Sequence, residues 1–182
     1  IIGPVELWVT PAVYVKNLFV VPDWETGKVK IQATVLNTRT QETLSSISFN
    51  ISEAQTGTPV ILENYGQKMD TGSNRLEVEI QLPEHKLWSP DDPLLYRLTA
   101  SIQTLGSTDE KSVRFGFRDF RFENGYFRLN GKRIFLNGMN FSTHFPVGYT
   151  VPLNEDMLRK DVVNMKALGF NFVRIPFGFP NP

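Results

Sequence analysis

Three polar side chains that could bind a ligand lie at or just after the ends of two predicted strands. Asn140 ends one apolar run, Arg174 ends the next, and His144 lies in the loop that follows Asn140. Their amide, guanidinium and imidazole groups can donate hydrogen bonds to hydroxyl or carboxylate oxygens. Each also has a structural explanation, because Asn140 could cap a loop, His144 could bond to a local partner and Arg174 could form an ordinary ion pair.

Other kinds of chemistry are excluded by residue type. The chain has no cysteine, which excludes thiol catalysis, disulfides, zinc-thiolate sites and iron-sulfur clusters. It has only two histidines, and His85 is expected to be structural or exposed. Asp91 and Asp92 between prolines form a single acidic pair, which lacks the roughly six to eight oxygens of a Ca²⁺ cage and favours a turn. We therefore expect no metal and no cofactor.

The composition is that of an ordinary globular protein. Of the 182 residues, 41% are hydrophobic and 21% charged, which excludes disorder as the main state. Nineteen Lys and Arg balance nineteen Asp and Glu, and no apolar stretch approaches the roughly 18 residues of a membrane span. We expect no nucleic-acid and no membrane partner. The start, Ile1-Ile2-Gly3-Pro4, is typical of a mature or excised segment. The sequence is compatible with a periplasmic, a secreted or a cytoplasmic location.

The two halves of the chain differ in charge and aromatic content. Up to Ser112 there are nine Lys and Arg against fourteen Asp and Glu, and from Val113 onward ten against five. All three tryptophans lie in the first half, whereas twelve of the fourteen phenylalanines lie from Phe115 onward. We therefore predict one domain over residues 1–112 and a second part over residues 113–182.

The first part is predicted to be an immunoglobulin-like β-sandwich. Short runs rich in β-branched and aromatic residues, many alternating apolar with polar, are separated by Gly, Pro, Asn and Asp turns. Seven or eight such strands in this length are typical of that fold, and without cysteine hydrophobic packing alone must hold the sheets together. The expected strands cover residues 5–10, 13–21, 29–36, 47–51, 59–62, 76–82, 95–102 and 111–117.

The second part changes pattern. Asn130-Gly131 between apolar runs predicts a hairpin, because both turn residues need positive φ. Residues 154–169 predict a helix with Asn154 as N-cap and Gly169 just after its end. Its expected buried stripe is Leu158, Val162, Met165 and Leu168. With apolar runs at 134–141 and 170–175, this makes one βαβ unit, the repeat of a (β/α)8 barrel, whose whole length is roughly 250 residues.

Four stretches in order resemble glycoside hydrolase family 2, the β-galactosidases, β-glucuronidases and β-mannosidases. Residues 3–7 resemble the family's entry into its sandwich, and residues 87–96 its "W-x-P-x-x-P-x-L-Y" segment. Residues 115–118 and 127–132 match "G-F-R" and "F-x-L-N-G-K". Residues 136–140, His144 and 157–174 are similar to its first barrel strand, helix and second strand. The resemblance implies a sandwich followed by the truncated start of a (β/α)8 barrel.

The resemblance implies a retaining glycosidase that acts on β-linked sugars through two carboxyl groups about 5 Å apart. In the family these two carboxyl groups follow the fourth and seventh barrel strands. None of the acidic residues from Val113 onward is placed for that role; these are Asp119, Glu123, Glu155, Asp156 and Asp161. We expect no catalytic residue in this chain and no hydrolysis by it alone. Arg174 is expected to steady the nucleophile, and Asn140 and His144 to contact sugar.

Departures from the family leave the sugar open. Residues 141–146 keep only His144 and Pro146 of the usual "R-H-E-x-H-P", and residues 175–180 lack the His of "S-H-Y-P". The sequence of residues 173–176 also resembles family 5 glycosidases, although the preceding sandwich favours family 2.

A non-catalytic carbohydrate-binding or adhesion module is the alternative hypothesis. Trp8, Trp24 and Trp88 could stack on sugar rings, or Trp88 could pack at the junction of sandwich and barrel and the other two in the sandwich core. A lone βαβ unit would leave apolar faces uncovered, so we also expect self-association through phenylalanines such as Phe135, Phe170 and Phe172.

Overall fold

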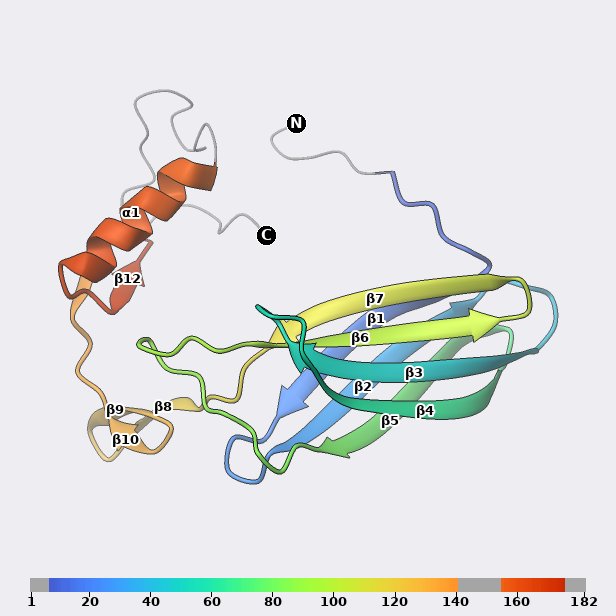
Figure 1. Ribbon diagram of the computed structural model, residues 1–182, viewed down its shortest axis with the longest axis horizontal. Helices are drawn as coiled ribbons and strands as arrows, with labels where there is room; N and C mark the ends of the chain where they lie inside the picture. Colours follow the sequence, from blue (N-terminus) through green and yellow to red (C-terminus); the bar gives the residue numbers. More distant parts are fainter. Residues whose placement is uncertain (1–6, 141–154, 176–182) are drawn as a thin grey trace. The chain divides into compact units, whose positions relative to one another are not determined.

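The computed structural model describes residues 7–140 and 155–175, and the chain divides into two compact units, Ile1–Asp119 and Phe120–Pro182. The first unit is a mainly β sandwich of two antiparallel sheets packed face to face (Figure 1). One sheet has the order β1-β2-β5 and the other β4-β3-β6-β7. Their strands are β1 (Val13–Pro22), β2 (Lys28–Asn37), β3 (Thr43–Glu53), β4 (Pro59–Met69), β5 (Gly72–Gln81), β6 (Tyr96–Thr104) and β7 (Ser107–Phe115).

Seven of the eight predicted strands are confirmed, and the first is wrong. The described residues of the expected strand at 5–10 form no strand, and Leu7, Trp8 and Val9 are 91%, 70% and 87% exposed. Alternating hydrophobicity suits a strand only where a neighbouring strand offers its backbone, and this segment pairs with none in the described part of the chain. The remaining two of its residues lie outside the described range.

The period of two places one face of each strand in the core. On β2 the side chains of Val29, Ile31, Ala33 and Val35 are all buried, and the residues between them lie on the opposite face. On β1 the spacing of buried residues changes from two to three, because a bulge at Lys16 shifts the register. The buried residues of the facing sheet are Ile47, Phe49, Ile51, Met69, Tyr96, Leu98, Ala100, Ile102, Thr104 and Phe115.

The sheets differ from a constant-type immunoglobulin domain in the partner of the fourth strand. In that type the fourth strand joins the sheet of the first, second and fifth strands. Here β4 pairs with β3 along almost its whole length, from Thr43 opposite Met69 to Ser52 opposite Pro59. The fourth strand therefore belongs to the sheet of the third, sixth and seventh strands, and sequence alternation could not reveal this pairing.

Side chains of β7 tie the two sheets together along one open edge. Where the bulge interrupts the pairing of β1, the backbone N–H of Val15 donates to Asp109 Oδ2 at 2.8 Å. Lys111 Nζ donates to the backbone oxygen of Lys16 at 2.8 Å. These two bonds satisfy backbone groups at a sheet edge, where unpaired groups would otherwise invite pairing with another chain.

A buried asparagine connects the sheets at the opposite side. Asn37 ends β2, is 1% exposed, and donates through Nδ2 to the backbone oxygens of Met69 and Gln41, both at 3.1 Å. Its Oδ1 accepts from the backbone N–H of Arg39 at 3.0 Å. The amide is thus paired at both ends, as a buried polar group must be.

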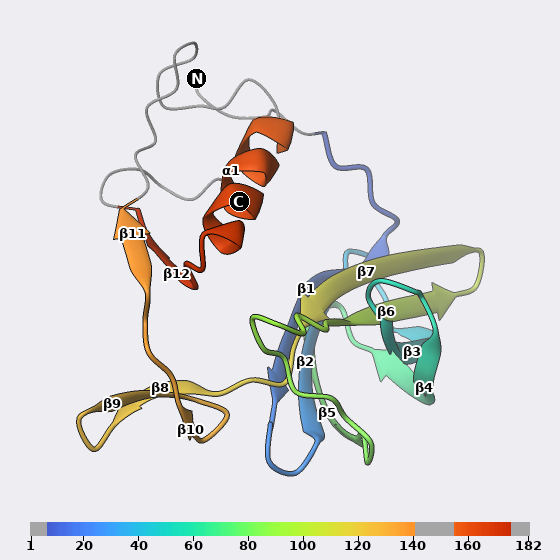
Figure 2. The ribbon, with the colours of Figure 1, turned by 60° about the vertical axis from the view of Figure 1, so that its left-hand side comes forward.

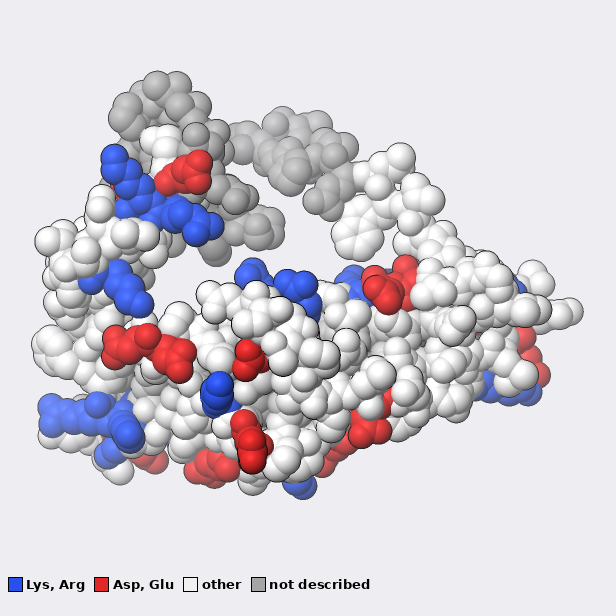
Figure 3. Space-filling view, viewed as in Figure 1, with Lys and Arg blue, Asp and Glu red and all other residues white. Residues whose placement is uncertain are grey.

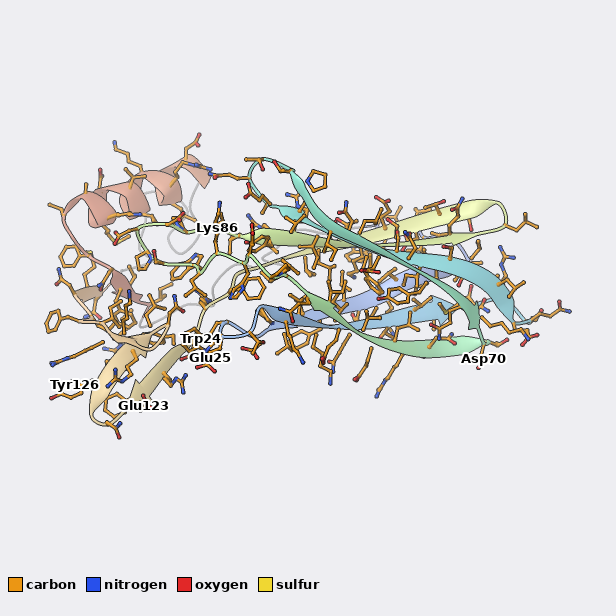
Figure 4. The ribbon with its side chains drawn as sticks, turned by 60° about the horizontal axis from the view of Figure 1, so that its bottom comes forward. Trp24, Glu25, Asp70, Lys86, Glu123 and Tyr126 are labelled. Atoms are coloured by element: carbon orange, nitrogen blue, oxygen red, sulfur yellow. The ribbon has the colours of Figure 1, made fainter. Side chains whose placement is uncertain are left out.

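The connection from β5 to β6 closes one end of the sandwich around the turn between β1 and β2. Figure 4 shows Trp24, Glu25 and Lys86 at this end and Asp70 at the other. The backbone N–H of Leu82 donates to Gly27 O at 2.9 Å, and Gly27 has a φ of 74°. A Cβ atom on Gly27 would lie 2.3 Å from Leu82 O and 2.4 Å from His85 Nδ1. Only glycine fits this contact.

Asp23 shapes the same turn. Its Oδ1 accepts from the backbone N–H groups of Glu25 at 2.9 Å and Thr26 at 3.2 Å. The Thr26 hydroxyl, followed by these two N–H groups, lowers the pKa of the Asp23 carboxyl below its usual value. The ionised side chain is therefore the form that suits the turn.

The end of the sandwich lies later than the change in charge. Strand β7 runs through Ser112 to Phe115, and Phe117 is fully buried in the core. The phenylalanines that follow, Phe120 and Phe122, are 51% and 66% exposed and belong to the second unit. The two units divide after Asp119 rather than after Ser112, because β7 is a single strand whose hydrogen bonds to β6 continue past the point where the composition changes.

The second unit begins with a small sheet of three strands, β8 (Phe120–Glu123), β9 (Tyr126–Leu129) and β10 (Lys132–Arg133). The predicted hairpin at Asn130-Gly131 is confirmed, with φ angles of 51° and 73°. Asn124-Gly125 makes a second turn of the same kind, with φ angles of 50° and 81°, between the register partners Glu123 and Tyr126 (Figure 4). This second hairpin was missed although it carries the same signal.

The remaining elements are β11 (Gly138–Asn140), α1 (Glu155–Ala167) and β12 (Phe172–Arg174), and α1 lies beside the two strands (Figure 2). Gly169 follows the helix with a φ of 84°, as predicted. The predicted buried stripe is wrong in part: Met165 is 8% exposed, but Val162 and Leu168 are 57% and 74% exposed. Two strands of three residues offer too little apolar surface to cover a helix of 13 residues.

Charge is spread over the sandwich in pairs. Lys and Arg side chains lie among Asp and Glu side chains on the face in Figure 3. Across β2 and β5, Lys30 Nζ lies 3.1 Å from Glu77 Oε2 and Lys28 Nζ 3.7 Å from Glu79 Oε1. The described residues include no helix long and apolar enough to cross a membrane.

Replacing Gly27 by Ala should destabilise the sandwich more than replacing Gly57. Both glycines have a φ of 74°, but a Cβ on Gly57 meets no atom within 4 Å. We expect Gly57→Ala to lower the free energy of unfolding by about 1 kcal/mol through its φ alone. We expect Gly27→Ala to lower it by about 3 kcal/mol, because the clash adds to this strain. Urea unfolding followed by tryptophan fluorescence measures both, and equal losses would contradict the close contact.

Replacing Asn37 by Ala should remove the buried amide bonds between the two sheets. We expect Asn37→Ala to lower the free energy of unfolding by about 2 kcal/mol, because buried backbone groups lose their partners. Asn64→Ala, at an exposed position of β4, is the matched control and should change stability by less than about 0.5 kcal/mol. A similar loss in both variants would show that the bonds of Asn37 do not matter.

Candidate functional site

Two of the predicted binding residues are brought together by a parallel strand pair. Strands β11 and β12 lie side by side with the register Gly138 to Phe172, Met139 to Val173 and Asn140 to Arg174. The helix α1 connects them, so the predicted βαβ unit is present. Asn140 and Arg174 are thus neighbours at the C-terminal ends of their strands, and both are exposed.

The side chains of Asn140 and Arg174 can serve one ligand. Residues directly opposite each other in a sheet point to the same face, because successive side chains alternate. Arg174 offers a planar set of N–H donors, and Asn140 offers two donors and an acceptor. A carboxylate held by the guanidinium and a hydroxyl held by the amide would suit this pair. The third predicted residue, His144, lies outside the described residues.

Two asparagines that the sequence analysis missed join the beginnings of the same strands. The backbone N–H of Asn137 donates to Asn171 Oδ1 at 2.9 Å, and the backbone N–H of Asn171 donates to Asn137 O at 3.0 Å. Asn137 Nδ2 donates to Gly169 O at 3.0 Å, and Asn171 Nδ2 donates to Phe135 O at 2.9 Å. A signal was available, because each asparagine stands three residues before a candidate binding residue.

Glycine at position 138 allows the two strands to meet. A Cβ atom on Gly138 would lie 2.5 Å from Cδ1 of Phe172, its register partner. The phenyl ring therefore occupies the space that any other side chain at position 138 would need.

The acidic residues of the second unit do not gather at these strand ends. Asp156 and Asp161 belong to α1, and Glu123 Oε2 lies 3.1 Å from Arg128 Nε in the hairpin. Within residues 7–140 and 155–175, no three His, Asp or Glu side chains are close enough to hold a metal ion. Asp91 and Asp92 lie in a turn, as predicted, where the backbone N–H of Asp92 donates to Ser89 Oγ at 3.0 Å.

His85 has a structural role at the end of the sandwich. Its Nε2 lies 2.9 Å from the backbone oxygen of Trp24, which can only accept, so Nε2 carries the proton. The ring packs on Phe117 with a centroid distance of 4.5 Å. This confirms that His85 belongs to the fold rather than to a binding site.

The three tryptophans form separate contacts and not a common platform. Trp24 packs against the sandwich core, and Trp88 lies under the Arg118 guanidinium at 4.9 Å from the ring centroid. Trp8, for which core packing was one of the two alternatives, is 70% exposed, with Lys111 Nζ 5.3 Å from its ring centroid. Each ring is therefore engaged by a different neighbour.

Comparison with known proteins matches the sandwich to a protein family. The family model for glycosyl hydrolases family 2 matches residues 13–118, more than half of the chain. These residues run from the first residue of β1 to just before the end of the first unit.

Solved structures share the fold. The β-glucuronidases of Parabacteroides merdae and Bacteroides uniformis are 24% and 23% identical, with TM-scores of 0.77 and 0.80. Each match covers 94% of this chain and 22% of the other. A glycosyl hydrolase family 2 member from Bacteroides cellulosilyticus is 21% identical, with a TM-score of 0.79 over 94% of this chain and 24% of its own.

The chain therefore spans about a quarter or less of the length of these solved structures, and a match over 94% of it must include residues of both units. At this identity the likeness shows a shared fold. The family model that matches β1 to β7 assigns the chain to glycosyl hydrolases family 2.

Proposed function

We propose that this chain is a segment of a retaining glycoside hydrolase that acts on β-linked sugars. In this proposal the sandwich is a scaffold, and the βαβ unit is the start of a catalytic (β/α)8 barrel. Membership of glycosyl hydrolases family 2 supports the activity. The single observation that carries the site is the register that sets Asn140 beside Arg174 at the C-terminal ends of parallel strands. Active sites of (β/α)8 barrels lie at those ends.

The exposed apolar residues of the second unit support a barrel start. Phe172 and Val173 on β12 and Val162 and Leu168 on α1 are between 37% and 74% exposed. Such residues at the strand pair and its helix suit a unit that is covered by further strands and helices. We propose that the rest of a barrel covers them in the whole protein.

Arg174, Asn140 and His144 are proposed as substrate-site residues in that whole protein. A guanidinium at the end of the second strand can hold the carboxylate nucleophile in its ionised form by charge-assisted hydrogen bonds. The Asn140 amide next to it can bond to a sugar hydroxyl. His144, four residues after Asn140, is proposed as a further sugar contact.

The two carboxyl groups of a retaining mechanism are proposed to come from barrel strands that this chain does not contain. A retaining glycosidase needs them about 5 Å apart across the scissile bond. No Asp or Glu lies on the described strands β11 and β12 themselves. The chain is therefore proposed to be inactive alone. A non-catalytic glycan-binding module is the second candidate, and its test is binding of the isolated chain to a glycan array.

The isolated chain should not hydrolyse glycosides. We expect no release of nitrophenol above background from the p-nitrophenyl β-galactoside, β-glucuronide or β-mannoside. The longer protein encoded by the same gene should hydrolyse at least one of them. Turnover by the isolated chain that is lost in Glu123→Gln or Asp156→Asn would overturn the proposal that its carboxylates are not catalytic.

In the longer protein, Arg174→Lys should lower kcat about 100-fold, because lysine keeps the charge but loses the planar set of donors. Arg159→Lys, at an exposed position of α1, is the matched control and should leave kcat unchanged. Steady-state kinetics on the best nitrophenyl glycoside measures both variants. An unchanged kcat in Arg174→Lys would remove this residue from the site.

The isolated chain should self-associate through its second unit. Phe135 and Leu168 are 81% and 74% exposed there, and apolar surface of this kind drives association. We expect the sedimentation coefficient to rise with concentration, and Phe135→Lys and Leu168→Lys to weaken that rise. Leu105→Lys is the control, because Leu105 is 94% exposed but belongs to the sandwich. A monomer at all concentrations would contradict the prediction.

A further inference from the structure

The register of β11 and β12 is the feature that sets Asn140 beside Arg174. Each strand has three residues, so the backbone ladder between them is short. A shift by one residue would move every side chain of β12 to the other face and would leave Arg174 facing away from Asn140. The position of the candidate site therefore depends on whatever fixes this register.

Hydrophobic burial is a weak guide to the register here. In most sheets a buried face selects the pairing, because a slip would expose it. On β12, however, all three residues are exposed, Phe172 and Val173 by 43% and 37%. Met139 is the only residue of β11 that is even partly buried. Specific side-chain contacts must therefore select the register, because burial does not.

The Asn137 and Asn171 side chains supply such contacts at the other end of the strand pair. Each side chain bonds across to the segment that precedes the opposite strand: Asn171 Nδ2 reaches Phe135 O, and Asn137 Nδ2 reaches Gly169 O. Asn171 Oδ1 also accepts the backbone N–H of Asn137. A slip of one residue is about 3.3 Å and would break all three side-chain bonds together.

The ring of Phe172 adds a steric selection for the same register. It lies over Gly138, where a Cβ atom would come within 2.5 Å of Cδ1. A shift in either direction would place Asn137 or Met139, both with a Cβ atom, opposite Phe172. The glycine contact and the amide bonds thus select one and the same pairing.

We propose that Asn137 and Asn171 are positioning residues that fix the register of β11 and β12 and thereby hold Arg174 next to Asn140. This inference rests on the function proposed above for Arg174, but the register itself does not. The two asparagines touch neither reacting groups nor substrate in this proposal. They act through the strand pair.

Substitution by aspartate tests the amide bonds with the least change in shape. In Asn171→Asp the acceptor for the Asn137 N–H remains, but an oxygen replaces the donor that faces Phe135 O. In Asn137→Asp an oxygen likewise replaces the donor that faces Gly169 O. Asn164→Asp is the matched control, because Asn164 is exposed on α1 and its side chain takes part in none of these bonds.

The register can be measured in this 182-residue chain by NMR. We expect cross-strand nuclear Overhauser effects between Met139 and Val173, and between Asn140 and Arg174, in the unchanged chain and in Asn164→Asp. We expect them to be lost in Asn137→Asp and Asn171→Asp, with amide exchange on β11 and β12 faster by about tenfold or more per bond removed. Signals of β1 to β7 serve as the folding control. Effects that persist in both aspartate variants would overturn the proposal.

Kinetics of the longer protein separate positioning from a general loss of stability. We expect Asn171→Asp to lower kcat about tenfold with a smaller change in KM, because the group held by Arg174 acts in the chemical step. In an Arg174→Lys background the same substitution should have almost no further effect, because its consequence passes through Arg174. Full additivity of the two losses would overturn the positioning role.

The NMR and kinetic experiments distinguish a wrong proposed function from a wrong positioning role. If the unchanged longer protein hydrolyses no glycoside, the proposed function is wrong, and the NMR experiment still decides whether the asparagines fix the register. If the longer protein is active and the cross-strand signals are lost while kcat stays unchanged, the positioning role is overturned and the proposed function stands.

Discussion

Burial of alternate side chains between two sheets is the constraint on which the structure depends. No disulfide holds the sheets, since the chain has no cysteine. Residues such as Ile31, Val35, Phe49 and Leu98 are fully buried, and each contributes about 1.5–3 kcal/mol relative to an exposed position. Such a core requires every strand to keep its register. The turn at Gly27, the buried amide of Asn37 and the β7 contacts to β1 all serve that requirement.

The second unit relies less on hydrophobic burial and more on specific side-chain contacts. Its parallel strand pair is short and little buried, so side-chain amides and the contact of Phe172 with Gly138 take the place that core packing has in the sandwich. Polar bonds of this kind are directional and break when the geometry changes by a few ångströms. They define one arrangement without adding much stability, which suits strand ends that are proposed to place functional groups.

Local patterns in the sequence were accurate where the physical cause is local. The turn at Asn130-Gly131 and the glycine after α1 adopt the positive φ angles that the residue types favour. The period of two correctly gave seven strands. The period of two was misleading before Val13, because a strand also needs a partner. The helical spacing of apolar residues was misleading along α1, because an apolar stripe is buried only when enough surface lies against it.

The sequence by itself determined the sandwich, the βαβ unit and the residues Asn140 and Arg174 as candidates. These follow from periodicity, turn residues and motif order, which can be recognised along the chain. Only the tertiary structure decided that β4 pairs with β3, that Trp24, Trp88 and Trp8 have separate partners, and that Asn140 lies opposite Arg174. Pairing of distant segments depends on the geometry of both at once, and the amides of Asn137 and Asn171, 34 residues apart, gain a role only when the strands meet.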